Sequence, residues 1–194
     1  MRNTRIKNLA ATALLAALML VLQITGIGII PIPPAGVTVL HIPIIIGTLA
    51  CGLMTGLVLG LEFGIISLVM AYRVPTPLSI CFMDPVVAII PRLLIPLAVW
   101  LVARAMHTQK RMLCSSISAL AGSLANTVFV LGTIALLYGE QLALALGTSP
   151  DALLGAVVAF GAISGLPEAA VAAILTVAVD KALRAMGYYG EGKT

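Results

Sequence analysis

The sequence predicts an all-α integral membrane protein with six transmembrane helices, and with both its N-terminus and its C-terminus in the cytoplasm. Of the 194 residues, 61% are hydrophobic and 9% are charged, and the mean hydropathy is +1.15. No formally charged residue occurs from Asn8 through Leu61. Because a single soluble core cannot bury so much apolar sequence, we expect the chain to lie in a lipid bilayer.

Six apolar segments are long enough to span a bilayer, for which about 20 residues or somewhat fewer suffice. A basic start before the first segment also resembles a secretory signal, but five further spans behind it favour a signal anchor. We expect one transmembrane domain over residues 1–194. The predicted spans are residues 8–26, 39–54, 57–72, 80–104, 113–138 and 152–182.

Positive charge sets the predicted topology. Three clusters of three residues hold nine of the eleven Lys and Arg: Arg2, Arg5 and Lys7; Arg104, Lys110 and Arg111; Lys181, Arg184 and Lys193. Lys and Arg are retained on the cytoplasmic side of membranes, so four spans should separate the first two clusters and two spans the last two. The net charge of +4 is then explained by cytoplasmic loops and does not indicate nucleic-acid binding.

Two of the connections predicted to lie outside the cell are rich in proline. Residues 27–38 contain the run Pro31-Ile32-Pro33-Pro34-Ala35-Gly36, and residues 73–80 contain Pro75 and Pro77. Proline fixes φ and removes a backbone donor, so we expect stiff, non-helical covers over the outer end of the bundle. The connection 139–150 should lie on the same side.

Small residues mark faces where helices pack closely. Gly52, Gly56, Gly60 and Gly64 recur every fourth residue, starting at the turn between the second and third spans. The first span carries a similar pair, Ala13 and Ala17. Such spacing is typical of tight helix interfaces in lipid, either within the chain or with a partner.

Arg92 is the leading candidate for a functional residue, because ionisable groups inside spans face the protein interior and are costly. It lies between Pro91 and Pro96, so we expect a broken or kinked helix around it. A guanidinium in such a place can grip a substrate carboxylate. The alternative is an internal ion pair with Glu62, Asp84 or Glu168.

Three further polar residues lie in or beside predicted spans. Glu168 follows Gly165-Leu166-Pro167, which predicts another helix interruption. Asn126 needs a hydrogen-bonding partner in the fifth span and either contacts a ligand or bridges two helices. His41 follows the proline-rich connection and is more often a satisfied interfacial residue than a ligand contact. The role of Glu62 is open.

Enzyme, metal and nucleotide sites are not indicated. Residues 187–194 match the phosphate-loop pattern G-x-x-x-x-G-K-[ST], but that loop requires a following helix and the sequence ends at Thr194. The nucleophile elbow and the H-E-x-x-H motif do not occur. Cys51, Cys81 and Cys114 have no paired spacing, so we expect neither a disulfide nor a metal site.

Several of these segments together resemble a known family. They are Pro33 through Pro43, the glycine pattern of the third span, Phe82-Met83-Asp84-Pro85 and Ile90-Pro91-Arg92. In this pattern the chain is similar to the substrate-binding S-components of energy-coupling factor (ECF) vitamin transporters, and most similar to the pantothenate-type branch.

The resemblance implies a multi-pass protein of the prokaryotic plasma membrane that captures a vitamin or related micronutrient at an outward-facing pocket. A separate transmembrane T-subunit and two ATPase subunits would then drive uptake, so ATP would be used by these partners and no cofactor is expected in this chain. The small-residue face for docking would be Ala13 and Ala17. The resemblance implies Arg92, Asn126 and Glu168 as pocket residues, and Asp84 and His41 are further candidates for substrate binding.

A cationic Arg92 favours a carboxylate-bearing vitamin such as pantothenate. Folate, and cobalamin or one of its precursors, are alternative substrates, whereas the charged segment of riboflavin-type members is missing after the second span. The competing function is an autonomous ion-coupled secondary transporter or channel subunit, which would use the same intramembrane charges as an ion path.

Overall fold

The computed structural model describes residues 2–32, 35–73, 79–106, 109–186 and 188. Within these described residues, five helices are long and apolar enough to cross a membrane. They are α1 (Arg2–Thr25), α3 (Leu53–Arg73), α4 (Pro85–Ala105), α5 (Arg111–Leu137) and α7 (Leu153–Ala185). The predicted class is confirmed in so far as the chain is mainly helical and has several helices able to span a membrane. Apart from Tyr188, the phosphate-loop-like segment 187–194 lies outside the described residues.

The second predicted span contains only a short helix, α2 (Ile42–Cys51), of 10 residues. At 1.5 Å per residue α2 is about 15 Å long, roughly half the hydrocarbon thickness, so the expected full-length helix over residues 39–54 is wrong. Pro43 stands in the first turn, and Gly52 ends α2 with φ at +97°. A side chain is strained at that φ, which explains why the helix stops at a glycine.

The proline-rich connection before α2 is an antiparallel hairpin of β1 (Ile29–Ile32) and β2 (Ala35–Thr38). Its register pairs Ile29 with Thr38 and Ile32 with Ala35. The connection is non-helical, as predicted, although two strands were not expected in an all-α chain. The second strand lies against α7. Of the other proline-rich connection, residues 74–78 lie outside the described part, and a 3-10 turn, η1 (Ser79–Met83), follows them.

The connection 139–150 is more ordered than a loop. It contains a short helix, α6 (Gly139–Leu146), and reaches the 3-10 turn η2 (Pro150–Ala152) that leads into α7. One apolar cluster joins α6 to η1 and to the start of α4, because buried Leu142 packs with Cys81 and Val87. These three elements therefore cover one end of the bundle together.

The helix breaks expected at Arg92 and Glu168 are not found, because α4 and α7 run unbroken through Pro91, Pro96 and Pro167. The alternative of a kink at Arg92 stays a prediction. A proline leaves the carbonyl four residues earlier without its usual donor. In α4 the carbonyl freed by Pro91 belongs to Val87, and it accepts a hydrogen bond from Nη1 of Arg92 at 3.3 Å. A side chain thus supplies a donor to the carbonyl that Pro91 leaves without its backbone partner.

Tight packing of α3 on α4 is confirmed at three of the four predicted glycines. A Cβ at Gly60 would lie 2.7 Å from the carbonyl oxygen of Arg92, and one at Gly64 would lie 2.9 Å from Cα of Ile89. Gly56 is equally confined, with Pro96 at 2.6 Å. Gly52 is different, since it ends α2 and faces open space.

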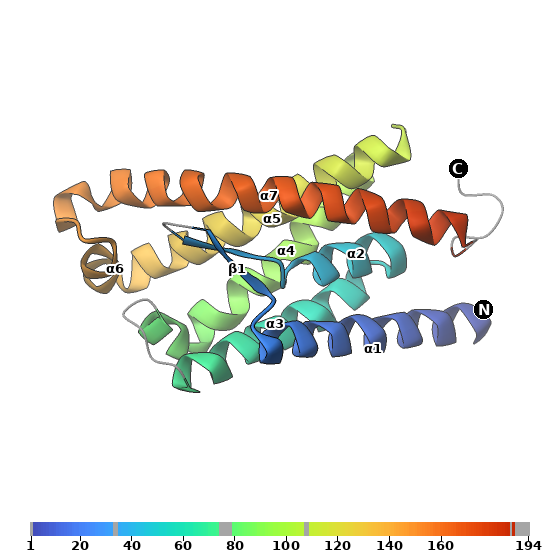
Figure 1. The fold of residues 1–194 in the computed structure, drawn as a ribbon, viewed down its shortest axis with the longest axis horizontal. Coiled ribbons are helices and arrows are strands. Elements are labelled where there is room, and N and C mark those ends of the chain that lie inside the picture. The colour runs from blue at the N-terminus through green and yellow to red at the C-terminus, as the bar shows by residue number, and fades with distance from the viewer. Residues whose placement is uncertain (1, 33–34, 74–78, 107–108, 187, 189–194) are drawn as a thin grey trace.

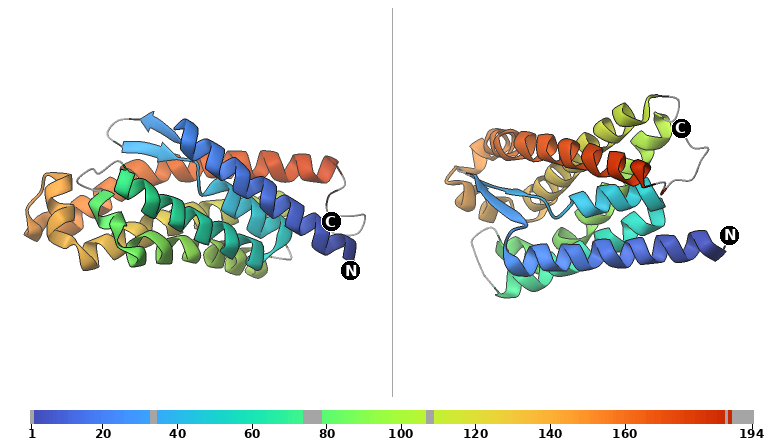
Figure 2. Two further views of the ribbon diagram at one scale, coloured as in Figure 1. Left: turned by 90° about the horizontal axis from the view of Figure 1, so that it is seen from below. Right: turned by 45° about the vertical axis from the view of Figure 1, so that its right-hand side comes forward.

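The course of the chain brings the described residues of the three basic clusters toward one end of the bundle, while Lys193 lies outside the described residues. In Figure 1 the start of α1, the end of α7, and the junction of α4 with α5 lie at the right, whereas the hairpin and α6 lie toward the left. Figure 2 shows α1 as a peripheral helix, and only 6% of its apolar window is buried. The predicted segregation of basic clusters from the proline-rich connections therefore agrees with the fold.

Candidate functional site

Four of the predicted site residues are buried to a similar extent, although they come from four different segments. His41 precedes α2, Arg92 lies on α4, Asn126 on α5 and Glu168 on α7, with exposed fractions of 0%, 6%, 7% and 7%. Each polar residue is therefore turned into the bundle.

The contacts of neighbouring residues on α5 show where Asn126 lies along the length of the bundle. One turn before it, Gly122 faces Val99 of α4, and one turn after it, Val130 packs in the cluster that contains Val87. Asn126 thus lies beside the middle of α4, the segment that carries Arg92. On the other side of α5, Thr127 contacts Gly165, which places Asn126 near the level of Glu168 on α7.

His41 and Glu168 form the closest contact within this group. Nδ1 of His41 lies 3.3 Å from Oε1 of Glu168, in an orientation that does not make a good hydrogen bond. His41 is also the residue that caps the start of α2. Because the start of a helix carries partial positive charge, it is a favourable place for the Glu168 carboxylate or for the anionic part of a ligand.

Arg92 is held by aromatic rings rather than by a carboxylate. Its guanidinium carbon lies 5.2 Å from the ring centroid of Phe63 and 4.8 Å from that of Phe82, both within the range of cation–π attraction. Sequence reasoning missed both phenylalanines, because nothing in their spacing indicates that α3 and η1 converge on α4. Within the described part of the chain, Arg92 makes no ion pair within 4.0 Å, so the pairs considered with Glu62, Asp84 and Glu168 are not found.

Several buried polar atoms of this group have no hydrogen-bond partner among the described residues. They are Nε of Arg92, both ring nitrogens of His41, Oδ1 of Asn126 and Oε1 of Glu168. Buried polar atoms are ordinarily bonded, and leaving one unbonded costs about 1–3 kcal/mol. The group therefore offers cationic and neutral donors together with acceptors, which suits a small polar ligand carrying an anionic end.

Asp84 belongs to a different part of the structure. It caps α4, since Oδ1 accepts a hydrogen bond from the Val86 amide at 2.8 Å, and Oδ2 accepts one from the Tyr138 hydroxyl at 2.9 Å. Bonding to Asp84 raises the pKa of Tyr138, because it stabilises the protonated phenol. Two helix turns, about 12 Å, separate Asp84 from Arg92, so the structure does not bring it into the buried group.

Comparison with known proteins identifies the family of this chain. The family model described as "ECF transporter, substrate-specific component" matches residues 7–179. This chain belongs to the S-components of ECF transporters. A similar protein is the "Pantothenic acid transporter PanT" of Lactococcus lactis subsp. cremoris (strain MG1363), which is 35% identical over 94% of this chain and 96% of its own length. The S-component is a multi-pass protein of a prokaryotic plasma membrane, and its family is one of transporters rather than enzymes.

The predicted docking residues of the S-component lie on its surface. Ala13 and Ala17 are both exposed on α1, so internal packing does not account for this pair. Ala16, one position before Ala17, instead packs against the main core. The structure thus leaves the predicted small-residue face open to the membrane.

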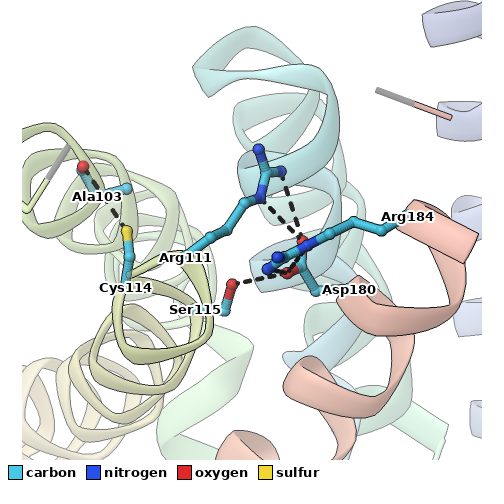
Figure 3. Close-up of polar contacts among 6 residues, drawn as sticks. All are labelled: Ala103, Arg111, Cys114, Ser115, Asp180 and Arg184. Atoms are coloured by element: carbon cyan, nitrogen blue, oxygen red, sulfur yellow. Dashed lines mark hydrogen bonds and ion pairs between the residues drawn. The ribbon is translucent and has the colours of Figure 1, made fainter. Parts of the chain in front are cut away.

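A second polar group, which sequence reasoning missed, joins α5 to α7 at the end of the S-component that carries the basic clusters (Figure 3). Asp180, 4% exposed, accepts hydrogen bonds from Ser115 at 3.1 Å, Arg111 at 3.4 Å and Nε of Arg184 at 3.2 Å. In the sequence, the four-residue spacing of Asp180 and Arg184 could have indicated an ion pair on one face of a helix. Two residues interpreted only as topology signals therefore also stabilise the fold.

Proposed function

We propose that this S-component captures pantothenate at an outward-facing site and delivers it for ATP-driven uptake by partner subunits. The observation that carries the proposal is the buried guanidinium of Arg92. It stacks against the rings of Phe63 and Phe82, and its Nε has no hydrogen-bond partner among the described residues. Pantothenate offers a carboxylate for that guanidinium, and an amide and hydroxyl groups for His41, Asn126 and Glu168. The 35% identity to a protein named as a pantothenic acid transporter supports the same substrate.

The proposed orientation places both termini in the cytoplasm, with six passes through the bilayer. The hairpin together with α2 would make the second pass, since α2 alone is too short. Because the basic clusters gather at one end of the bundle (Figure 1), that end would face the cytoplasm. The hairpin, η1 and α6 would then cover the site from outside.

The proposed partners are a transmembrane T-subunit and two ATPase subunits, which would use the ATP, while this chain would hold no cofactor. The exposed pair Ala13 and Ala17 would contact the T-subunit, because small residues let membrane helices approach closely. Family membership supports a module of this kind.

Titration calorimetry on the chain purified alone tests the substrate. We expect one-to-one binding of pantothenate without ATP, with pantothenol, in which an alcohol replaces the carboxylate, binding more weakly. Folate and cobalamin serve as competing ligands, and tight binding of either would contradict the substrate assignment. Uptake by the chain alone, driven by an ion gradient, would contradict the S-component function and support an autonomous secondary transporter.

A further inference from the structure

Glu62 is a carboxylate half-way along a membrane-spanning helix, outside the buried group described above. It is the tenth residue of α3, so about 14 Å and about 17 Å of helix separate it from the two ends. Its side chain is partly exposed, and it forms no hydrogen bond or ion pair with any other described residue. A carboxylate this deep cannot reach the bilayer surface, and such groups normally meet a protein partner or a hydrated cavity.

The contacts between α1 and α3 show which face of α3 carries Glu62. Thr12 and Thr55 lie 3.2 Å apart at their hydroxyls, and the two helices run in the same direction along the bundle (Figure 1). Glu62 follows Thr55 by seven residues, a rotation of only about 20° from that contact. It lies about 160° from Gly64, which faces α4. Glu62 is therefore on the α1 side of α3.

Extending the same alignment places Glu62 level with Met19 of α1, two residues beyond Ala17. On α1, Leu15 faces α2 at Gly47, and Thr12 faces α3. Rotating further about the axis of α1, from Leu15 past Thr12, the next residues are Ala16, Ala13 and Ala17, each about 40–60° beyond the one before. Ala13 and Ala17 thus lie about 100° and about 140° around α1 from Thr12, past α3 on the side away from α2. They form one surface with Glu62 and with the exposed apolar residues of α3, which are Val58, Leu61, Ile65 and Val69.

We propose that this α1–α3 surface receives a membrane helix of the T-subunit that presents a basic side chain to Glu62. The inference rests on the proposed function and adds a charged contact to the docking face. Two features of the surface support this occupant: the alanines allow close approach of a helix, and the unpaired carboxylate calls for a complementary charge in a low-dielectric setting. Neither feature is needed to face lipid.

The test compares Glu62→Leu, Glu62→Gln and wild-type chains, each co-expressed with the T-subunit and ATPases. Glu140→Leu is the control, since Glu140 is an exposed acid on α6, outside the α1–α3 surface. Pantothenate affinity of the isolated chain, co-purification of the module and uptake are measured. We expect Glu62→Leu to keep its affinity for pantothenate and to lower module association about tenfold, with Glu62→Gln intermediate. Glu140→Leu should behave as wild type.

Normal module association and uptake by Glu62→Leu would overturn the inference while leaving the proposed function intact. A second variant tests the neighbour directly: Glu62→Cys should crosslink to the T-subunit in membranes, and Glu140→Cys should not. If Glu62→Cys instead crosslinks to a second copy of the chain, the surface is a homodimer interface and the inference is wrong. If the wild-type chain takes up pantothenate without any module, both proposals fail.

Discussion

His41 and Glu168 are 127 positions apart in the sequence, yet Nδ1 of the histidine lies 3.3 Å from Oε1 of the glutamate in the interior of the bundle. The contact joins the start of the shortened helix α2 to the middle of α7. Because α2 begins inside the bundle rather than at its surface, its first residue can take part in a buried site. The short second helix is therefore what makes this pair possible.

The first prediction concerns the coupling of this pair. We expect His41→Ala and Glu168→Gln each to weaken pantothenate binding, and the double variant to lose no more than the worse single variant. Each change leaves the other group buried without its neighbour, so a coupling free energy of about 0.5–3 kcal/mol is expected. Calorimetry on the four proteins of this cycle measures it. Strictly additive losses would show that the two residues act independently.

The second prediction concerns Arg92. Arg92→Ala should lower the affinity for pantothenate about 100-fold or more, since a hydrogen-bonded charge contributes about 1.5–3 kcal/mol and the aromatic rings would lose their cation. Arg92→Lys should restore only part of this, because an ammonium cannot bond a carboxylate through two parallel donors. The measurement is calorimetry, with thermal unfolding to check folding.

Arg104 provides a matched control for Arg92. It lies on the same helix and also stacks on an aromatic ring, with its guanidinium carbon 5.1 Å from the Trp100 ring centroid. Twelve residues, about 18 Å, separate the two arginines along α4. Arg104→Ala should leave the affinity unchanged. Unchanged affinity in Arg92→Ala as well would reduce Arg92 to a structural role.

The third prediction assigns a positioning role to Phe82. Phe82→Leu should lower the affinity for pantothenate about fivefold by removing one ring from the Arg92 guanidinium, whereas its affinity for pantothenol should change little. The ratio of the two affinities separates positioning of the guanidinium from a general loss of packing. Phe82→Tyr, which keeps the ring, should bind both ligands normally. Equal losses for both ligands would contradict this role.

Much of the fold followed from two regular signals. Apolar length predicted the five long helices, and the spacing of Gly56, Gly60 and Gly64 predicted the tight contact of α3 with α4. Both signals are local and periodic, so a sequence displays them directly. The length of α2 was overestimated because the residues around its true ends are apolar, and hydropathy cannot distinguish an apolar helix from an apolar strand or turn.

The buried site was only partly predictable for a different reason. Arg92, Asn126, Glu168 and His41 could be named because polar residues are rare in apolar spans. Their partners depend on which helices meet, so Phe63 and Phe82 could not be named. The helix breaks expected at the prolines are not found, and at Pro91 the sequence does not show that Arg92 itself bonds the carbonyl that the proline frees.

The fourth prediction concerns Asp180, which binds side chains from α5 and α7 (Figure 3). Asp180→Asn should destabilise the protein by about 1–3 kcal/mol, because Arg111 and Arg184 lose their anionic partner. Pantothenate affinity should remain close to wild type, since Asp180 lies about 18 Å along α7 from Glu168. Thermal unfolding in nanodiscs measures the first effect and calorimetry the second. Asp151→Asn, at an exposed acid in η2, is the control and should be neutral.

The fifth prediction separates binding from docking. Ala13→Trp combined with Ala17→Trp should leave pantothenate binding by the isolated chain unchanged, because both residues are exposed on the peripheral helix α1. Uptake in cells that carry the module should be blocked, since two indole rings prevent a helix of the T-subunit from approaching. Leu136→Trp places the same bulk at a position of α5 that is 86% exposed, and it should transport normally. If uptake survives in the double variant, this face of α1 is not the docking surface, and the contact proposed for Glu62 loses its neighbouring support.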